Sequence, residues 1–586
     1  MKSFNQLKKN LKQDFTGLKK TKISILGDSA TQLLNYALKG IGYDYGFDAD
    51  IFEADFNQIE LQVFSPDSEY YNHDAQYTLI FFSTHKLLKS FYKLQKEERK
   101  NFADNRLNQF KEIFSIVNSR AKTQLICYNF NEIDDHVFGS YSNKTDDSFL
   151  YQVRKLNYKL SELSTQISNL HISDISSIQN QFGKEKFFQP SVYVNSDIVI
   201  GLDVLPYVAK STFDIISALE GKIKKCIILD LDNTLWGGII GDDGIENIQI
   251  GGLGIGKAFT EFQYWLKELK NRGVILAVCS KNNEDVAKVP FEKHPEMILR
   301  LDDISVFVAN WENKASNIRH IQQVLNIGFD SMVFLDDNPF ERNMVRENIV
   351  GIAVPELPED PALYLEYLYI LNLFETVGIS KEDGERTKQY QTEAKRMEYQ
   401  KSFVDEDDFL KNLNMNSIVE GFNSYNTPRV SQLSQRSNQF NLRTVRYSES
   451  EIKEMGNKTN IHPFAFHLED KFGDHGLISL VVMKEATKES LFIETWLMSC
   501  RVLKRGMENF VLNTIVQHAI ENKYKKIIGE YIPSSKNEMV KNHYQDLGFV
   551  SRNGMWELLL DSYQFKKTFI QKKTNHVERN HIATSN

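Results

Sequence analysis

Short apolar runs alternate with amphipathic stretches through the middle of the chain, residues 215–375. The pattern predicts buried strands at IKKCIILDLD, VILAVCSKN and SMVFLDDNP. Between them it predicts two helices, AFTEFQYWLKELKNRG and NKASNIRHIQQVLNIG, each of which ends in glycine. Strands that alternate with helices are typical of a doubly wound parallel sheet. Polar residues at the strand ends then mark the edge where such sheets bind ligands.

The block before it, residues 1–205, is also patterned as an α/β layer. It opens with the short apolar strand KISILG, which is followed by Asp28, Ser29 and an amphipathic helix. Two later apolar runs, YTLIFFS and TQLICYNF, are separated by helical stretches and read as further strands. The alternation favours a parallel sheet here as well.

The block after it, residues 402–570, has a different order of elements. Two predicted strands, HGLISLVVMK and SLFIETWLMS, precede a long helix from about residue 505 to residue 522. We therefore expect an α+β domain rather than a doubly wound one. A charged helical linker is predicted at 376–401, and a polar, disordered tail at 571–586.

Composition narrows the class of protein. The chain of 586 residues is too long for one hydrophobic core, and its 41% hydrophobic and 25% charged content is ordinary for a globular protein. A net charge of −8 argues against nucleic acid as a partner. The four cysteines form no CxxC pair and are too few for a disulfide framework. There is no signal peptide and no run near the roughly 18 apolar residues of a membrane span, so we expect a cytoplasmic protein without a membrane partner.

Two carboxylates follow the first strand of the central block. In LDLDNTLWGG, Asp230 and Asp232 flank one residue, so on a strand both would leave from the same face. One carboxylate of such a pair can attack phosphorus, while the other protonates the leaving oxygen and later activates water. Asp336 and Asp337, after the strand SMVFL, add the acids needed to hold Mg²⁺.

Ser280 and Lys314 complete the candidate site. Ser280 follows VILAVC and offers a hydroxyl to a phosphate oxygen, and Lys314 offers a cation near a helix start. The order strand-DxDxT, strand-Ser, helix-Lys, strand-DD resembles the haloacid-dehalogenase (HAD) superfamily of Mg²⁺-dependent phosphatases. The resemblance implies a nucleophile (Asp230), a general acid/base (Asp232), phosphate contacts (Thr234, Ser280, Lys314) and Mg²⁺ ligands (Asp230, Asp232, Asp336, Asp337).

The spacing of these motifs leaves no room for a large cap domain. One turn, one helix and one strand fill the chain between Asp230 and Ser280, and the stretch from Ser280 to Lys314 is shorter. Members of the superfamily that act on small metabolites usually carry a cap in one of these gaps. We therefore expect an open site, which suits a macromolecular substrate or a partner domain.

A narrower resemblance covers residues 200–450 closely. The stretches DLDNTLWGGIIGDDGIENIQIG, CSKNNEDVA, FLDDNPFERNMV and SQRSNQFNLRTVRYSESEI resemble the FkbH-like subfamily. The resemblance implies a substrate and a partner: a phosphorylated three-carbon acid of the 1,3-bisphosphoglycerate type, and an acyl carrier protein. Such enzymes release phosphate and pass the glyceryl group to the phosphopantetheine thiol of the carrier.

Cys279 lies immediately before Ser280. It would reach the site only if the strand ended there, because successive strand residues point to opposite faces. Two interpretations stay open: a buried core residue, or a transient acyl acceptor activated by a neighbouring lysine.

The flanking blocks resemble two other families. ISILGDSAT resembles the first motif of SGNH/GDSL hydrolases, which makes Ser29 a candidate nucleophile. The matching later region, VNSDIVIGLDVLPYVAK, has no histidine, so an inert or ligand-binding scaffold is the alternative.

The third block resembles GNAT acyltransferases. Arg501 to Gly506 is a candidate pyrophosphate loop at a helix start, and Tyr544 in HYQDLGF is a candidate general acid. The loop lacks the full glycine-rich form, but the fold would suit a pantetheine arm.

Together these observations predict a multidomain α/β enzyme: a central HAD sheet without a large cap, an SGNH-like domain before it and a GNAT-like domain after it. The expected activity is Mg²⁺-dependent dephosphorylation coupled to acyl transfer onto a carrier protein. The alternative is a stand-alone phosphatase that acts on a small phosphate ester or a sugar phosphate.

Overall fold

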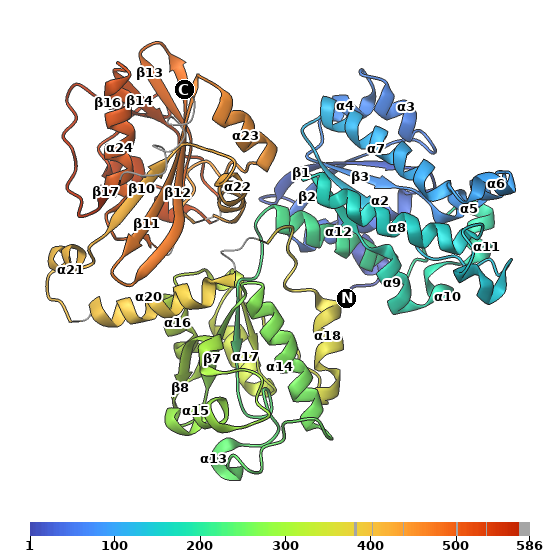
Figure 1. Ribbon diagram of the computed structural model, residues 1–586, viewed down its shortest axis with the longest axis horizontal. Helices are drawn as coiled ribbons and strands as arrows, with labels where there is room; N and C mark the ends of the chain where they lie inside the picture. Colours follow the sequence, from blue (N-terminus) through green and yellow to red (C-terminus); the bar gives the residue numbers. More distant parts are fainter. Residues whose placement is uncertain (380–383, 401, 438, 500–501, 535, 574–586) are drawn as a thin grey trace, which may run out of the picture. The chain divides into compact units, whose positions relative to one another are not determined.

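The computed structural model describes residues 1–379, 384–400, 402–437, 439–499, 502–534 and 536–573 (Figure 1). These residues divide into two compact units, 1–220 and 221 onwards. No helix within the described ranges is long and apolar enough to cross a bilayer.

The first unit is built on a five-stranded parallel sheet in the order β2-β1-β3-β4-β5. Its strands are β1 (Lys19–Gly27), β2 (Phe47–Glu53), β3 (Tyr77–Phe81), β4 (Gln124–Tyr128) and β5 (Leu170–Ser173). The three strands predicted from apolar runs lie in β1, β3 and β4, and the parallel arrangement is confirmed.

Helices connect the strands of the first unit. They are α1 (Phe4–Asn10), α2 (Gln32–Asp44), α3 (Ile59–Phe64), α4 (Glu69–His73), α5 (Thr84–Tyr92), α6 (Lys96–Arg99), α7 (Phe102–Arg120), α8 (Phe149–Gln166), α9 (Ile175–Phe182), α10 (Lys184–Phe187), α11 (Pro190–Ser196) and α12 (Leu205–Leu219). The predicted boundary at residue 205 is too early, because α12 belongs to this unit. Phe213 of α12 packs on Phe47 of β2, with ring centroids 5.8 Å apart.

A four-stranded parallel sheet forms the centre of the second unit, in the order β8-β7-β6-β9. Its strands are β6 (Cys226–Leu229), β7 (Ile275–Ser280), β8 (Ile304–Ala309) and β9 (Met332–Leu335). Separate hydrophobic clusters cover its two faces, as expected for a doubly wound sheet. The surrounding helices are α13 (Ile240–Asp243), α14 (Gly256–Asn271), α15 (Glu284–Lys293), α16 (Lys314–Leu325), α17 (Pro339–Asn348) and α18 (Tyr364–Leu371).

The second unit also holds a mixed eight-stranded sheet, in the order β15-β16-β14-β13-β12-β11-β10-β17. The strands are β10 (Asn416–Glu420), β11 (Ile461–Asp470), β12 (Gly473–Thr487), β13 (Ser490–Met498), β14 (Lys526–Gly529), β15 (Val550–Arg552), β16 (Met555–Leu559) and β17 (Gln571–Lys573). The helices of this part are α21 (Glu406–Asn412), α22 (Thr427–Arg436), α23 (Glu449–Asn457), α24 (Met507–Glu521) and α25 (His543–Asp546). The predicted strands and long helix match β12, β13 and α24.

One prediction in this unit needs correction. The linker helix α20 (Arg386–Gln400) contacts β7 and β8 of one sheet and β12 of the other, and both sheets lie in one compact unit, although each has its own hydrophobic clusters. Residues 571–573, predicted to belong to a disordered tail, form β17, because their backbone pairs in parallel with β10. The rest of that tail, 574–586, lies outside the described residues.

Candidate active site

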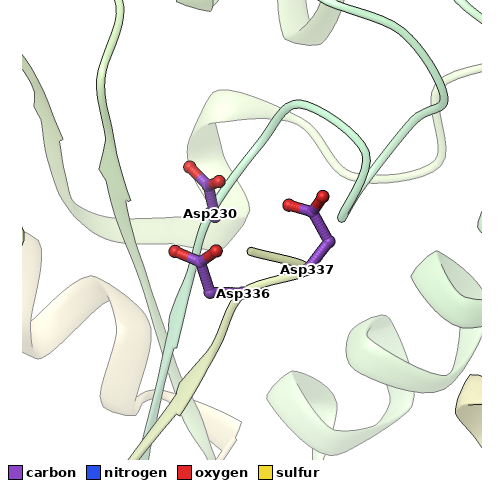
Figure 2. A group of neighbouring side chains, drawn as sticks. All are labelled: Asp230, Asp336 and Asp337. Carbon is purple, nitrogen blue, oxygen red and sulfur yellow. The ribbon is translucent and has the colours of Figure 1, made fainter. Parts of the chain in front are cut away.

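Three carboxylates gather at the carboxyl ends of β6 and β9, which are neighbouring parallel strands. The Asp230 N–H donates to the Leu335 carbonyl at 3.0 Å, which joins the two strand ends. Asp230, Asp336 and Asp337 each offer a carboxylate oxygen, and these oxygens lie within 4.8 Å of one another (Figure 2). A compact set of oxygen ligands fits a hard divalent cation such as Mg²⁺.

Lys314 lies among these acids at the start of α16. Its Nζ is 2.9 Å from Asp230 Oδ2 and 2.5 Å from Asp336 Oδ2, and its side chain is 3% exposed. Burial alone would lower the pKa of Lys314, but the carboxylates of Asp230 and Asp336 outweigh it and raise that pKa. The ammonium therefore stays charged and partly neutralises the cluster.

The pKa values of two of these acids, Asp336 and Asp337, are raised. Burial, with the nearby charge of Asp230, raises the pKa of Asp336 to about 7, although Lys314 opposes the shift. Burial and Asp230 also raise the pKa of Asp337. Crowded, desolvated carboxylates of this kind are stabilised by a bound cation, so the electrostatics agree with a metal site.

The Asp232 carboxylate is not part of this group of three, and its predicted role as a Mg²⁺ ligand stays a prediction. Three donors hold its carboxylate: Trp236 Nε1 and the Ile240 N–H reach Oδ1, each at 3.0 Å, and Asn282 Nδ2 reaches Oδ2 at 2.8 Å. These bonds fix the side chain beside the phosphate site, where it can exchange a proton with the substrate.

Trp236 and Asn282 were missed by the sequence reasoning. Asn282 also donates to the Ser280 hydroxyl at 3.3 Å, so one amide links the candidate acid/base to a candidate phosphate contact. The only local signal was position, because Asn282 follows a strand end and Trp236 follows the DxDxT motif. Both residue types are common in turns and cores, so their roles could be identified only from the tertiary contacts.

The two candidate phosphate hydroxyls occupy different environments. Ser280 is the last residue of β7 and lies at the same edge of the sheet as the acids. The hydroxyl of Thr234 accepts the Asp337 N–H at 3.1 Å and lies 3.4 Å from Asp337 Oδ1. Thr234 therefore helps to orient Asp337, and its predicted contact with phosphate stays a prediction.

Cys279 is a core residue. The strand continues through Ser280, which pairs with Ala309, so Cys279 points to the opposite face from Ser280. Its side chain is fully buried in a hydrophobic cluster, and burial raises the pKa of the thiol to about 12. The predicted role of acyl acceptor is wrong, because an acyl group cannot reach the sulfur.

The candidate residues of the flanking blocks are also placed. Ser29 is buried, and among the described residues its Oγ has no hydrogen-bond partner, so no histidine is in place to activate it. Tyr544 is buried as well, and desolvation raises the pKa of its hydroxyl, which opposes a role as a freely accessible acid. Gly506 immediately precedes α24 as its N-cap and has φ 72°, a left-handed conformation that suits glycine. Arg501 lies outside the described residues.

Comparisons with known proteins agree with this geometry. The family model described as "FkbH, N-terminal domain" matches residues 22–217. The N-terminal part of the protein BF1531 from Bacteroides fragilis, whose crystal structure contains a phosphatase domain complexed with Mg, is 55% identical. The match covers 65% of this chain and 100% of that one, with a TM-score of 0.62. The chain belongs to the FkbH family.

The FkbH-family chain also has weaker structural similarity to acetyltransferases. They include the Escherichia coli ribosomal-protein-S18-alanine N-acetyltransferase, at 11% identity over 25% of this chain and 96% of that one, with a TM-score of 0.20. The Vibrio cholerae spermidine N-acetyltransferase is 16% identical. The match covers 26% of this chain and 98% of that one, with a TM-score of 0.21. At these scores they support no conclusion. No curated protein matches the chain.

The FkbH-family chain is therefore an enzyme, a HAD-type phosphatase whose cofactor is Mg²⁺. The carboxylate cluster supplies suitable ligands for that ion. The individual roles assigned to Asp230, Asp232 and Lys314 stay predictions.

Proposed function

We propose that this enzyme loads an acyl carrier protein. Its substrate would be a phosphorylated three-carbon acid of the 1,3-bisphosphoglycerate type, and its product a glyceryl or related thioester on the phosphopantetheine arm. The observation that carries the proposal is an acidic phosphatase site without a cap. Residues 230–337 are all described, and between the site motifs they contain only elements of the central layer, α13 to α16 with β7 to β9.

The two phosphoryl groups of such a substrate need different chemistry. At the ester phosphate, Asp230 attacks phosphorus, the P–O bond to the substrate breaks, and Asp232 gives a proton to the leaving oxygen. Water then attacks the aspartyl-phosphate, Asp232 takes its proton, and inorganic phosphate leaves. Mg²⁺ supplies charge neutralisation and orientation for the transferring group.

At the acyl phosphate, the bond that breaks joins carbon to oxygen. The pantetheine thiolate attacks the carbonyl carbon, a thioester forms, and phosphate departs with the bonding electrons. Because Cys279 is buried, the proposal does not use it, and the carrier thiol attacks the substrate directly. An open site is favourable, since a carrier protein must bring its arm to the bound substrate.

The eight-stranded sheet would bind the phosphopantetheine arm, which would give the part of the chain that forms this sheet a GNAT-like role. The parallel pairing of β13 with β14 spans three residue pairs and ends at Phe492 and Ile528, although β13 continues to Met498. Beyond the paired region lie the contacting rings of Trp496, His543 and Tyr544, and two of their polar atoms, Trp496 Nε1 and His543 Nε2, are buried without a partner among the described residues. The amides of a pantetheine arm would satisfy such groups.

The experiment is carrier loading followed by mass spectrometry. The enzyme is incubated with Mg²⁺, 1,3-bisphosphoglycerate and a carrier protein in its phosphopantetheinylated form, with the unmodified carrier as the control. We expect a hydroxylamine-labile glyceryl adduct on the modified carrier alone. With Asp230→Asn, release of the ester phosphate should stop. If the wild type releases phosphate but loads no carrier, the stand-alone phosphatase is the better description.

A further inference from the structure

Asp336 and Asp337 are neighbours in the sequence, yet both carboxylates belong to the same group of candidate metal ligands. Successive residues of an extended strand point to opposite faces, so two adjacent acids on a strand would not serve one ion. β9 ends at Leu335, directly before the pair, and the backbone bends at Asp337. The bonds that hold this bend therefore decide whether the two acids can act together.

Arg342 bonds to the main chain of the bend. Its Nη1 donates to the Asp336 carbonyl at 2.9 Å and to the Asp337 carbonyl at 2.7 Å. One nitrogen thus binds two successive carbonyls, an arrangement that the alternating residues of a strand do not offer. Arg342 is 5% exposed, so water competes little for these bonds. The guanidinium therefore fixes the main-chain orientation of both acids.

The start of α17 places Arg342 for this contact. Asn338 is the N-cap of the helix, its side chain accepts the Phe340 N–H at 2.9 Å, and Pro339 restricts the backbone of the first turn. The Arg342 N–H donates to the Asn338 carbonyl at 3.1 Å, which puts Arg342 one turn into the helix. Because helical side chains lean toward the N-terminus, its guanidinium extends back to the acids.

Glu356 orients the guanidinium. Its Oε2 accepts Arg342 Nε at 3.0 Å and lies 3.0 Å from Nη2, so the planar fork binds a carboxylate while Nη1 faces the two carbonyls. Arg346, one turn further along α17, also pairs with Glu356, and its other bonds go to Asn343 and to the Val354 carbonyl. The two arginines share one partner and differ in their contact with the acids.

We propose that Arg342 is a positioning residue of the phosphatase site. It holds the backbone of Asp336 and Asp337 in the bend that lets both carboxylates bind one Mg²⁺, and it acts only through these acids. Groups that orient metal ligands in this way typically contribute about 10–100-fold to metal affinity or activity. The inference concerns the phosphatase site alone and does not depend on acyl loading.

Metal binding by Arg342 variants of the full chain tests the proposal. Mn²⁺ is the probe because it takes the same oxygen ligands as Mg²⁺, and free Mn²⁺ is measured by electron paramagnetic resonance, with Mg²⁺ as the competitor. Arg342→Met should raise the dissociation constant about 10–100-fold. Arg342→Lys keeps the charge beside Glu356 but lacks the planar fork, so its dissociation constant should lie between those of the wild type and Arg342→Met. Phosphate release should need more Mg²⁺ in both variants and recover most of the wild-type rate at saturation, because the acids are intact.

Arg346→Lys is the matched control and should change Mn²⁺ affinity less than about twofold, because its pair with Glu356 is exposed. Thermal melting of the metal-free proteins is measured in parallel, and Arg342→Lys decides the test if Arg342→Met does not fold. Wild-type Mn²⁺ affinity in the folded Arg342 variants, even with lower melting temperatures, would overturn the proposal, because the arginine would then only stabilise the fold. Equal weakening by Arg346→Lys would also overturn it, since the effect would then come from Glu356 or from α17 as a whole.

Discussion

Replacing Lys314 tests the electrostatics of the phosphatase site most directly. Lys314→Met removes the ammonium that contacts Asp230 and Asp336, while the apolar part of the side chain keeps its space. Both carboxylates are then buried without this counterion. Breaking a buried ion pair by removing one partner typically costs about 3–5 kcal/mol. In metal-free protein we therefore expect the unfolding free energy to fall by about that amount.

The expected melting shift follows from the size of the folding unit. Each kcal/mol lowers the melting temperature by about 2–4 °C in a domain of about 150–250 residues, so the metal-free variant should melt about 6–20 °C lower. Mg²⁺ replaces the missing positive charge and binds only the folded state. Because the variant keeps more uncompensated negative charge, it should bind Mg²⁺ more tightly than the wild type, so the difference between the two should shrink when Mg²⁺ is added. Phosphatase turnover should fall about 10²–10³-fold, as when one group that stabilises transition-state charge is removed.

The assay is scanning calorimetry with EDTA and with saturating Mg²⁺, beside steady-state phosphate release. Lys257→Met is the control. Lys257 pairs with Glu261 at 3.6 Å, and the two side chains are 63% and 54% exposed, so its loss should cost less than about 1 kcal/mol whether or not Mg²⁺ is present. An equal melting shift of Lys314→Met with and without Mg²⁺, or no shift, would refute the reasoning.

Three further predictions concern the same site. Asn282→Ala removes a donor to the Asp232 carboxylate and should lower kcat about 10–100-fold without changing the Mg²⁺ requirement, whereas Asn283→Ala should have a small effect. Cys279→Ser should load carrier at the normal rate, and intact-protein mass spectrometry should find no acyl adduct that the wild type carries and the variant lacks, because the thiol is buried. The pKa of Asp336 is raised to about 7, above an unfolded value of about 3.9, so the folded metal-free protein binds the extra proton. Its unfolding free energy should fall as pH rises from about 4 to about 7, and denaturant titrations with Mg²⁺ should show this slope reduced.

The sequence alone determined the central layer and the positions of its acids. Apolar periodicity located β6, β7 and β9, and the carboxyl ends of parallel strands meet at one edge of a sheet. Asp230, Asp336 and Asp337 could therefore be placed together before any coordinates were known. Local pattern and strand direction were sufficient for this result.

The tertiary structure decided how the neighbouring side chains are used. Whether Cys279 or Ser280 faces the site depended on where β7 ends, and the pairing of Ser280 with Ala309 fixed that. The orientation of Asp232 depended on Asn282, 50 positions away in the chain. Such contacts join segments whose local sequences carry no sign of each other, so periodicity cannot supply them. They arise only when the strands and helices have packed.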